Sequence, residues 1–360
     1  MRRPSIILAL AAVIALCLPM GAIAARVKTA LPSRTIVGDF DTDQDPFIND
    51  GGSIGVAMYT EAGWGFAIIQ PSGEQRVLQA PNNSYLSIHS FTNNGELLGA
   101  TDSAQLKYDS SGNPTTLDLG TSGEDDSWFA NAMNNVGCLV GEHSYYHSTY
   151  SDDFSDSIVD AWYTSAAYLW RPDGTKMQLQ SVPGYGLNAP RDINDAGWVV
   201  GVAYDHRSFD AVPPTRYQAV LWSPDGRITS LRTGRRSTAI AISNLGEIAG
   251  YVDSDPVVWN TKGKLCRRLQ KPTWATGCHI EDINDKGVVV GYAFSTGYYW
   301  QADRAVAWDR NGRLIELAPL PGDTGSWACH INNSNQIVGW SQQYTMFGFE
   351  PSSLVVWTVN

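Results

Sequence analysis

The sequence predicts an all-β fold, a seven-bladed β-propeller built from four-stranded antiparallel blades. Two features lead to this prediction. The 34 glycines and 18 prolines interrupt the 360 residues too often for the long amphipathic windows of a helical bundle. A short motif also recurs seven times, at the spacing of propeller blades. The composition, 43% hydrophobic and 17% charged residues, excludes disordered, collagen-like and coiled-coil proteins.

The N-terminus has the features of a secretory signal peptide. Two arginines precede an apolar run over residues 6–20, and the small residues Ala22 and Ala24 follow, as a signal peptidase requires. The alternative is a membrane anchor, which needs about 20 consecutive apolar residues, and this run is shorter. We therefore expect a secreted or periplasmic protein without a membrane span. The expected organisation is a signal peptide at 1–24, an N-terminal extension at 25–33 and one propeller at 34–360.

The chain is acidic, with 36 Asp and Glu against 25 Lys and Arg and a formal net charge of −11. Loss of the signal peptide would remove two of the arginines and make the mature chain more acidic. A surface of this charge repels nucleic acid and anionic membranes, so we expect neither as a partner. The expected partner is an extracellular glycan or protein, bound by a monomer.

Four cysteines remain after cleavage of the signal peptide. In an oxidising exterior we expect one or two disulfides among them, and their spacing leaves three pairings open. No Cys-x-x-Cys pair is present, so a structural zinc site is not expected. The four residues are Cys138, Cys266, Cys278 and Cys329.

The recurring motif has nine positions. An apolar residue comes first, the second position is usually Asn, the third and fourth are turn residues, and the fifth is usually Gly. Three mostly apolar residues and a final Gly complete it. Its clearest copies are residues 193–201 and 283–291, both of the form Ile-Asn-Asp-x-Gly. Residues 133–141 and 242–250 match with one or two changes. Looser copies lie at 48–55, 91–99 and 331–339. The final glycines are Gly55, Gly99, Gly141, Gly201, Gly250, Gly291 and Gly339.

A second pattern follows each motif: an apolar stretch that ends in an aromatic residue, then a turn, usually with Asp-Gly or Asn-Gly, then another apolar stretch. Together the two patterns predict a four-stranded meander. One such sheet cannot bury both of its faces, so neighbouring sheets must stack in a ring. We expect the aromatic residue to fill the space between blades; the alternative is a sugar-binding ladder. These positions are Ile69, Tyr108, Trp170, Trp222, Trp259, Trp308 and Trp357.

The last repeat lacks its fourth strand, and a strand-like run at residues 35–40 has no partner in the first repeat. We therefore predict that residues 35–40 complete the last blade and close the ring without a covalent bond.

The combination of an Ala-rich strand ending in Phe or Trp with Ile-Asn-x-x-Gly-x-Val-Val-Gly resembles the HAF repeat family of extracellular repeat proteins. The resemblance covers roughly residues 47–360. Thr92, Ser243 and Asn335 depart from the motif and weaken individual units. The resemblance implies a secreted, propeller-like protein and does not imply a particular reaction.

The loops between second and third strands share one face of the ring with the links between blades, and they vary in length. Variable loops on a rigid scaffold commonly carry function, so we place the functional face there. Aromatic rings stack on sugars and polar side chains bind hydroxyls, which favours a carbohydrate ligand. The alternative is that these aromatics only pack against each other. The predicted ligand-binding residues are Trp128, His143, Tyr145, Tyr146, His147, Asn188, Tyr298, Trp300, Trp327, Trp340 and Tyr344.

Two other functions remain open, a polysaccharide lyase and a protein-interaction scaffold. A lyase needs a Tyr or His to remove the proton next to a uronate carboxyl, and a cation or proton donor to neutralise that carboxylate. The acidic composition argues against a polyuronate substrate unless the site is locally basic. Candidates for the catalytic roles are Tyr204, His206, Arg207, His279, Tyr299, Arg304 and His330.

Four aspartates alternate ahead of the first motif: Asp39, Asp41, Asp43 and Asp45. Clustered carboxylates outside the cell suit calcium, so we consider a calcium site here and expect no other cofactor. Pro46 stands where a calcium loop of the EF-hand type would turn, and alternating acids also describe a solvated strand edge.

Overall fold

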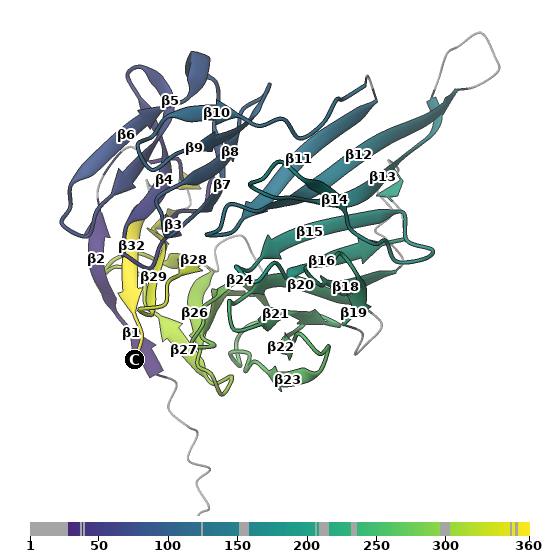
Figure 1. Ribbon diagram of the computed structural model, residues 1–360. Helices are drawn as coiled ribbons and strands as arrows, with labels where there is room; N and C mark the ends of the chain where they lie inside the picture. Colours follow the sequence, from purple (N-terminus) through teal and green to yellow (C-terminus); the bar gives the residue numbers. More distant parts are fainter. Residues whose placement is uncertain are drawn as a thin grey trace, which may run out of the picture.

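The computed structural model describes residues 28–36, 38, 40–123, 125–150, 158–205, 207–208, 216–231, 236–295, 303–345, 348–349 and 352–360. Seven sheets are arranged in a ring, as predicted (Figure 1). Residues from all seven line a cavity of about 180 Å³ at its centre, part of the central channel. In this part of the chain the only helical segment is one 3-10 turn, Pro81–Asn83. None of the helices in the described ranges is long and apolar enough to cross a membrane. The predicted signal peptide lies outside these ranges.

The blades follow one another along the chain, and we number them in that order. Blade 1 contains β3 (Phe47–Ile48), β4 (Ile54–Thr60), β5 (Gly63–Ile69) and β6 (Gln75–Gln79). Blade 2 contains β7 (Ser87–Phe91), β8 (Leu97–Ala100), β9 (Gln105–Tyr108) and β10 (Pro114–Thr116). Blade 3 contains β11 (Asp126–Met133), β12 (Leu139–Tyr150), β13 (Ile158–Trp170) and β14 (Lys176–Gln178), and the short β17 (Arg207–Ser208) pairs with β13.

Blade 4 contains β15 (Leu187–Ile193), β16 (Val199–Tyr204), β18 (Tyr217–Trp222) and β19 (Ile228–Ser230). Blade 5 contains β20 (Ser237–Ile242), β21 (Glu247–Val252), β22 (Asp255–Asn260) and β23 (Leu265–Arg268). Blade 6 contains β24 (Gly277–Ile283), β25 (Val289–Phe294), β26 (Arg304–Trp308) and β27 (Leu314–Leu317). Blade 7 contains β28 (Gly325–Ile331), β29 (Gln336–Gln342) and β32 (Ser353–Thr358), and a two-stranded sheet of β30 (Tyr344–Thr345) and β31 (Gly348–Phe349) precedes β32.

Two N-terminal strands lie on the outer edges of the last two blades. β2 (Pro32–Ile36) pairs antiparallel with β32 as the outermost strand of blade 7. The expected strand at residues 35–40 was therefore misplaced, because Phe40 instead forms an isolated bridge with Met58 of blade 1. β1 (Lys28–Ala30) adds a parallel fifth strand to blade 6 beside β27, so the segment expected to be an extension is partly structured.

The recurring aromatic residues fill the spaces between blades, as predicted. The Trp222 side chain is fully buried, and it packs among core residues of blades 3 and 4. Its indole Nε1 donates to Gln180 O at 2.7 Å, and Trp308 and Trp357 make the equivalent bond in their blades. The alternative of a sugar-binding ladder at these positions is wrong, because Trp222, Trp259, Trp308 and Trp357 expose no surface for stacking.

Close strand contacts explain the glycines of the motif. A Cβ atom at Gly201 would lie 2.2 Å from Ala189 O, since β15 has a β-bulge at this level. In the turn, Gly197 has a φ of 82°, which glycine adopts without strain. Asn335 takes the same place in the last copy with a φ of 61°, and Asn tolerates this conformation better than most residues.

The residue after the motif Asn belongs to a closed ring of hydrogen bonds around the channel. In each blade its backbone N–H donates to the Oδ1 of the equivalent residue in the next blade, at 2.6–2.9 Å. The seventh bond joins Asn333 N to Asp50 Oδ1, which links blade 7 to blade 1. We call these residues the Asx ring: Asp50, Asn93, Asn135, Asp195, Asn244, Asp285 and Asn333.

The motif Asn adds a second set of bonds between blades. The Nδ2 of Asn194 donates to Ser243 O in the next blade at 3.1 Å, while its Oδ1 accepts from Trp198 N at 3.0 Å within its own turn. Asn134, Asn284 and Asn332 donate across blades in the same way. The motif Asn therefore shapes the turn and binds the neighbouring blade, which a hydrophobic residue could not do.

All four cysteines of the described ranges are free thiols, and the predicted disulfides are wrong. The reason is geometric: Cys138, Cys266, Cys278 and Cys329 lie in four different blades. Burial raises the pKa of the Cys278 thiol to about 11, so this thiol stays protonated at neutral pH.

Asp50 provides a direct test of the Asx ring. Its carboxylate accepts the backbone N–H of Asn333 and side-chain N–H groups of Asn93 and Asn333. We expect Asp50→Ala to lower the free energy of unfolding by about 1–2 kcal/mol in chemical denaturation. Asp50→Asn keeps an acceptor and should cost less, and exposed Asp102→Ala is the control. Equal effects of Asp50→Ala and Asp102→Ala would contradict a stabilising ring.

Removal of residues 28–36 tests the contribution of the N-terminal strands. Without β2 the backbone of β32 becomes an exposed edge, so we expect a lower unfolding temperature and a tendency to aggregate. Removal of residues 28–30 alone leaves β2 in place and should have a smaller effect. A chain without 28–36 that unfolds at the parent's temperature would show that β2 is not needed to hold the ring closed.

Candidate ligand-binding cleft

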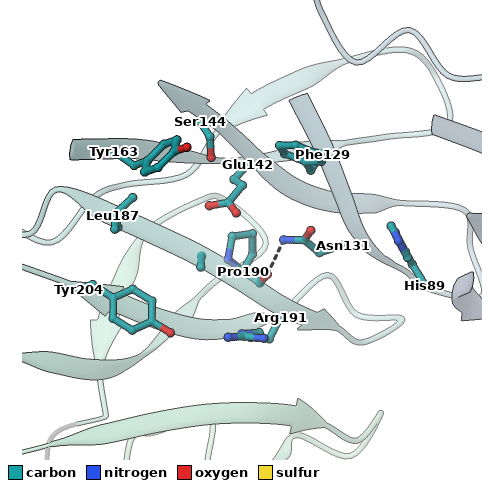
Figure 2. A pocket seen from close by; sticks show the side chains of 11 residues that line it. His89, Phe129, Asn131, Glu142, Ser144, Tyr163, Leu187, Pro190, Arg191 and Tyr204 are labelled. Carbon is teal, nitrogen blue, oxygen red and sulfur yellow. Dashed lines mark hydrogen bonds between the residues drawn. The ribbon is translucent and has the colours of Figure 1, made fainter. Parts of the chain in front are cut away.

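A cleft of about 650 Å³ opens between blades 3 and 4, at the ends of the strands that face the long loops. Figure 2 shows its two walls, with Phe129, Glu142, Ser144 and Tyr163 from blade 3 opposite Leu187, Pro190, Arg191 and Tyr204 from blade 4. Asn131 and Ala189 complete the lining, and His89 of blade 2 lies at its inner end. We call this cavity the main cleft.

Strand alternation and one bulge decide which side chains face the main cleft. Successive residues of a strand point to opposite sides of the sheet, so Glu142 and Ser144 of β12 face the cleft, and His143 and Tyr145 face away. Arg191 lies where the pairing of β15 with β16 skips one residue. A bulge turns a side chain away from its regular direction, which explains how Arg191 reaches the cleft.

Two polar side chains of the main cleft, Asn131 and His89, are held by bonds to the backbone. Asn131 Nδ2 donates to Pro190 O at 3.0 Å and so connects the two walls. His89 Nδ1 lies 2.8 Å from Ala130 O, and its Nε2 lies 3.0 Å from Ser87 Oγ. Burial lowers the pKa of His89 more than the bond to Ala130 raises it, so the ring is neutral at pH 7.

The inner end of the main cleft meets the central channel, because His89 and Arg191 also line a cavity of about 200 Å³ there. Burial raises the pKa of Asp192 to about 6, and the charge of Asp282 contributes. Bonds from the N–H groups of Ile193 and Ile242, both 2.8 Å long, partly offset this rise.

His330, predicted to be catalytic, also lies in the channel wall. Its ring stacks on Phe47 with centroids 4.1 Å apart, and its Nδ1 lies 3.3 Å from Asp282 Oδ2. Burial lowers the pKa of His330, but the bond to Asp282 and the charges of Asp282, Asp45 and Glu281 outweigh it and raise the pKa overall. The imidazole is therefore held by a carboxylate in the channel wall, and it lines the small cavity that His89 and Arg191 share with the main cleft.

Of the predicted site residues, Tyr204 lines the main cleft and Tyr146 lies beside it. The Tyr146 ring is 5.4 Å from that of Tyr163, a lining residue. The insertion that contains Tyr146 is not a loop in its described part, because it extends β12 and β13 into a long hairpin (Figure 1). The prediction that ligand-binding residues gather in a loop here was therefore wrong in this respect.

Trp128, His143 and Tyr145 pack against each other on the opposite side of blade 3. The Trp128 and His143 rings stack at 3.7 Å, and Lys176 Nζ lies 4.1 Å from the Trp128 ring centroid. His143 is 6% exposed and its Nε2 lies 2.8 Å from Asp126 Oδ2. These contacts match the alternative interpretation, self-packing of loop aromatics.

Asn188 and His147 also have local partners. Asn188 is buried, its N–H donates to Ser165 Oγ and its Oδ1 accepts from Val182 N. His147 Nε2 lies 2.9 Å from Thr164 Oγ1 on the paired strand. Neither side chain lines the main cleft.

Two smaller cavities open between later blades. The middle cleft, about 350 Å³, is lined by Tyr217, Arg236, Tyr251, Thr276, His279 and Phe294, among others. The acidic cleft, about 410 Å³, is lined by Asp43, Asp45, Glu281, Tyr292, Trp327 and Trp340, among others. The predicted residues His279, Trp327 and Trp340 are thus separated from Tyr204.

His279 and Trp327 each contact a carboxylate. The bond between His279 Nδ1 and Glu281 Oε1, 2.7 Å long, raises the pKa of His279 despite partial burial. Trp327 Nε1 donates to Asp303 Oδ2 at 3.1 Å, and Trp340 is nearly buried. Arg304 begins β26, and its buried Nη1 has no hydrogen-bond partner in the described ranges.

Several predicted residues cannot be placed. His206, Tyr298, Tyr299, Trp300 and Asp39 lie outside the described residues. For Arg207 and Tyr344 only the backbone strand is described, as part of β17 and β30.

The predicted calcium ligands are dispersed. Asp41 accepts bonds from Asp43 N at 3.1 Å and from Gln44 Nε2 at 2.8 Å, which stabilises the local turn. Asp43 and Asp45 line the acidic cleft. Within the described ranges, no three His, Cys, Asp or Glu side chains are grouped so that they could hold a metal ion.

The sequence analysis missed most of the main cleft: His89, Phe129, Asn131, Glu142 and Arg191. All five stand on strands and not on the variable loops, and His89, Asn131 and Arg191 lie where the strand pairing skips one residue. A usable signal exists for Arg191, because two charged residues, Arg191 and Asp192, stand directly before the motif Ile193 on a first strand.

No family model and no curated protein matches the sequence. Several solved structures match at low identity. An oligogalacturonate lyase from Vibrio parahaemolyticus is 12% identical with a TM-score of 0.55, and the match covers 91% of this chain and 92% of the lyase. A catalytically inactive virginiamycin B lyase from Staphylococcus aureus, with quinupristin, is 13% identical with a TM-score of 0.53, covering 91% and 99%. An acylaminoacyl peptidase from Pyrococcus horikoshii is 14% identical with a TM-score of 0.57, covering 91% of this chain and 51% of the peptidase. At these identities the likeness shows the propeller fold alone.

Burial of Asp192 allows a stability test over a defined pH range. The pKa of Asp192 is about 6 in the folded protein, against an ordinary value of 3.8, so folding favours the protonated acid. Stability from this group is present below about pH 4 and is lost as the pH rises through about 6. At about pH 7.5 we expect Asp192→Asn to be more stable than the parent by on the order of 1–3 kcal/mol in urea denaturation, and the difference should vanish near pH 4.

Asp282→Asn is the matched control for this test, because it loses the contact with His330 and should not stabilise the fold. A lower stability of Asp192→Asn at about pH 7.5 would contradict the raised pKa.

Proposed function

We propose that this protein is a secreted propeller that binds a glycan in the main cleft. The observation that carries the proposal is the combination of partly exposed aromatic rings and fixed polar groups in one cavity of suitable size. Its volume of about 650 Å³ lies within the range of small-molecule sites, roughly 300–1,000 Å³. Secretion and membership of the HAF repeat family belong to the same proposal and rest on the N-terminal sequence and the repeat motif.

The chemistry of the cleft suits a sugar. Tyr163 and Tyr204 present rings from opposite walls, and C–H faces of a pyranose can stack on such rings (Figure 2). Asn131, Glu142 and Arg191 supply donors and acceptors for hydroxyl groups. The bond from Asn131 to Pro190 fixes the amide before a ligand arrives, which lowers the entropy cost of binding.

The charges favour a neutral ligand. The cleft has one cationic group, Arg191, and one carboxylate, Glu142, and His89 is uncharged at pH 7 because burial lowers its pKa. These charges offset each other, so the site provides no net attraction for a polyanion.

A second candidate function is uronate elimination, favoured by the presence of Tyr204, Arg191 and His89 in the same cleft. In such a reaction a base removes the proton next to the uronate carboxyl, the C–O bond to the leaving sugar breaks, and a double bond forms in its place. Neutral His89 would take the proton from carbon, the Tyr204 hydroxyl would donate a proton to the departing sugar oxygen, and Arg191 would stabilise the charge on the carboxylate. A third candidate is a protein-interaction scaffold, in which the loops contact a secreted protein.

Glycan arrays followed by calorimetry test the proposal. We expect saturable binding of a neutral glycan, weakened about tenfold or more by Tyr204→Ala and by Asn131→Ala, a loss of about 1.4 kcal/mol. Tyr59→Ala is the matched control, because Tyr59 is 59% exposed and does not line the main cleft. Absence of any glycan binding, or equal losses in the Tyr59 and Tyr204 variants, would refute the proposal.

The same variants separate the other two candidates. Incubation with polyuronates should produce no ultraviolet absorbance of unsaturated sugars if the protein only binds. Absorbance that disappears in Arg191→Ala, with folding intact, would establish the lyase instead. Capture of one secreted protein without any response to sugars would establish the scaffold.

A further inference from the structure

The middle and acidic clefts lie on the same face of the ring as the main cleft. Tyr204 ends β16, the second strand of blade 4, and Tyr217 begins β18, the third strand of the same blade. Phe294 ends β25, the second strand of blade 6. Since second strands run toward the long loops and third strands start there, all three positions are at one mouth of the channel. The three cavities therefore follow each other around this mouth from blade 3 to blade 7.

Ring contacts connect each cavity to the next. Tyr204 of the main cleft and Tyr217 of the middle cleft have centroids 6.3 Å apart. Across the middle cleft, Tyr251 and His279 are 6.4 Å apart. His279 then stacks on Tyr292 of the acidic cleft, at 5.1 Å and an interplanar angle of 16°. An arc of aromatic and imidazole rings thus runs from the main cleft to the acidic cleft.

The rings of this arc are accessible. The side chain of His279 is 48% exposed, and Tyr204, Tyr217, Tyr292 and Trp327 are half-buried. The buried side of each ring is held by protein contacts, as in the bond from Trp327 to Asp303, so its exposed face has a defined orientation. Rings fixed in this way lose little entropy when a ligand stacks on them.

The charge changes along the arc. The main cleft contains Arg191, and the middle cleft contains Arg236. The acidic cleft has Asp43, Asp45 and Glu281, and no Lys or Arg among its described lining residues. Burial raises the pKa of Tyr292, and the charges of Glu281, Asp303 and Asp45 raise it further, as expected for a negative potential in this cavity. A polyanion that entered the main cleft would be repelled at the other end.

We infer that the ligand is a neutral oligosaccharide that lies along this arc, with one end in the main cleft and the other in the acidic cleft. The inference rests on the proposed function, because it assumes that the main cleft binds sugar. It adds the length and charge of the ligand: a chain of several uncharged units, which gains contacts at each cleft.

Oligosaccharide ladders test the arc. Cello-, xylo- and manno-oligosaccharides from two to six units are titrated against the protein, with oligogalacturonates as the anionic series. For a neutral series that binds, we expect affinity to rise about tenfold or more from the disaccharide to the hexasaccharide. Oligogalacturonates should show no such gain with length.

Variants locate the added contacts. Trp327→Ala should weaken the hexasaccharide about tenfold and leave the disaccharide unchanged, whereas Tyr204→Ala should weaken both. Trp274→Ala is the matched control, since Trp274 is 42% exposed and lines none of the three clefts. If Trp327→Ala fails to fold, His279→Ala replaces it, because this side chain is half exposed and is also expected to matter only for long chains.

The outcomes distinguish the two proposals. Disaccharide binding that needs Tyr204, with no gain from longer chains, would overturn the arc and keep the proposed function. Absence of binding throughout would overturn both. A gain with length that is equally strong for oligogalacturonates would overturn the neutral charge assigned to the ligand.

Discussion

The Asx ring is the interaction on which the rest of the structure depends. Each blade donates one backbone N–H to the side chain of the next, and the last bond returns to the first blade across 283 residues of chain. No two of its three aspartates are neighbours, so each carboxylate has amide side chains on both sides and like charges are kept apart. Because every blade is bound to the next at the turn between its first and second strands, the ring is closed at this end.

This constraint is related to where the clefts open. Bulges at the level of the motif glycine let successive strands approach closely, as at Gly201, and they redirect residues such as Arg191 and Asp192. At the opposite end the described residues form no such ring, and the three clefts open there. The closed end and the end with the candidate clefts therefore differ in how neighbouring blades are joined.

The sequence predicted the fold closely because its signals are local and repeated. The Asn turn, the Asp-Gly turns and the Trp between blades each make contacts within one blade or with the next. Because the pattern occurs seven times, the repeat can be recognised even where single copies depart from it. The N-terminal strand was misplaced by a few residues, since pairing between β2 and β32 depends on contacts more than 300 residues apart. The disulfide prediction failed for a related reason: the number of cysteines does not reveal which blades carry them.

The candidate cleft was predicted less well. Its face was inferred from loop lengths, and Tyr204, predicted as a catalytic candidate, lines it, but the alternation of β12 separates His143 and Tyr145 from Glu142 and Ser144. A composition-based search cannot make this distinction, because it depends on the register of an inserted hairpin. His89 was missed for another reason: it comes from a neighbouring blade and belongs to the cleft only once the ring is assembled.

The most direct test of glycan binding at this mouth is a crystal structure of the protein with a neutral hexasaccharide identified on the array. The account predicts sugar rings beside Tyr204 and Asn131 in the main cleft, with the chain continuing past His279 toward Trp327. A sugar bound on the face of the Asx ring, or on the outer strands of the blades, would contradict it.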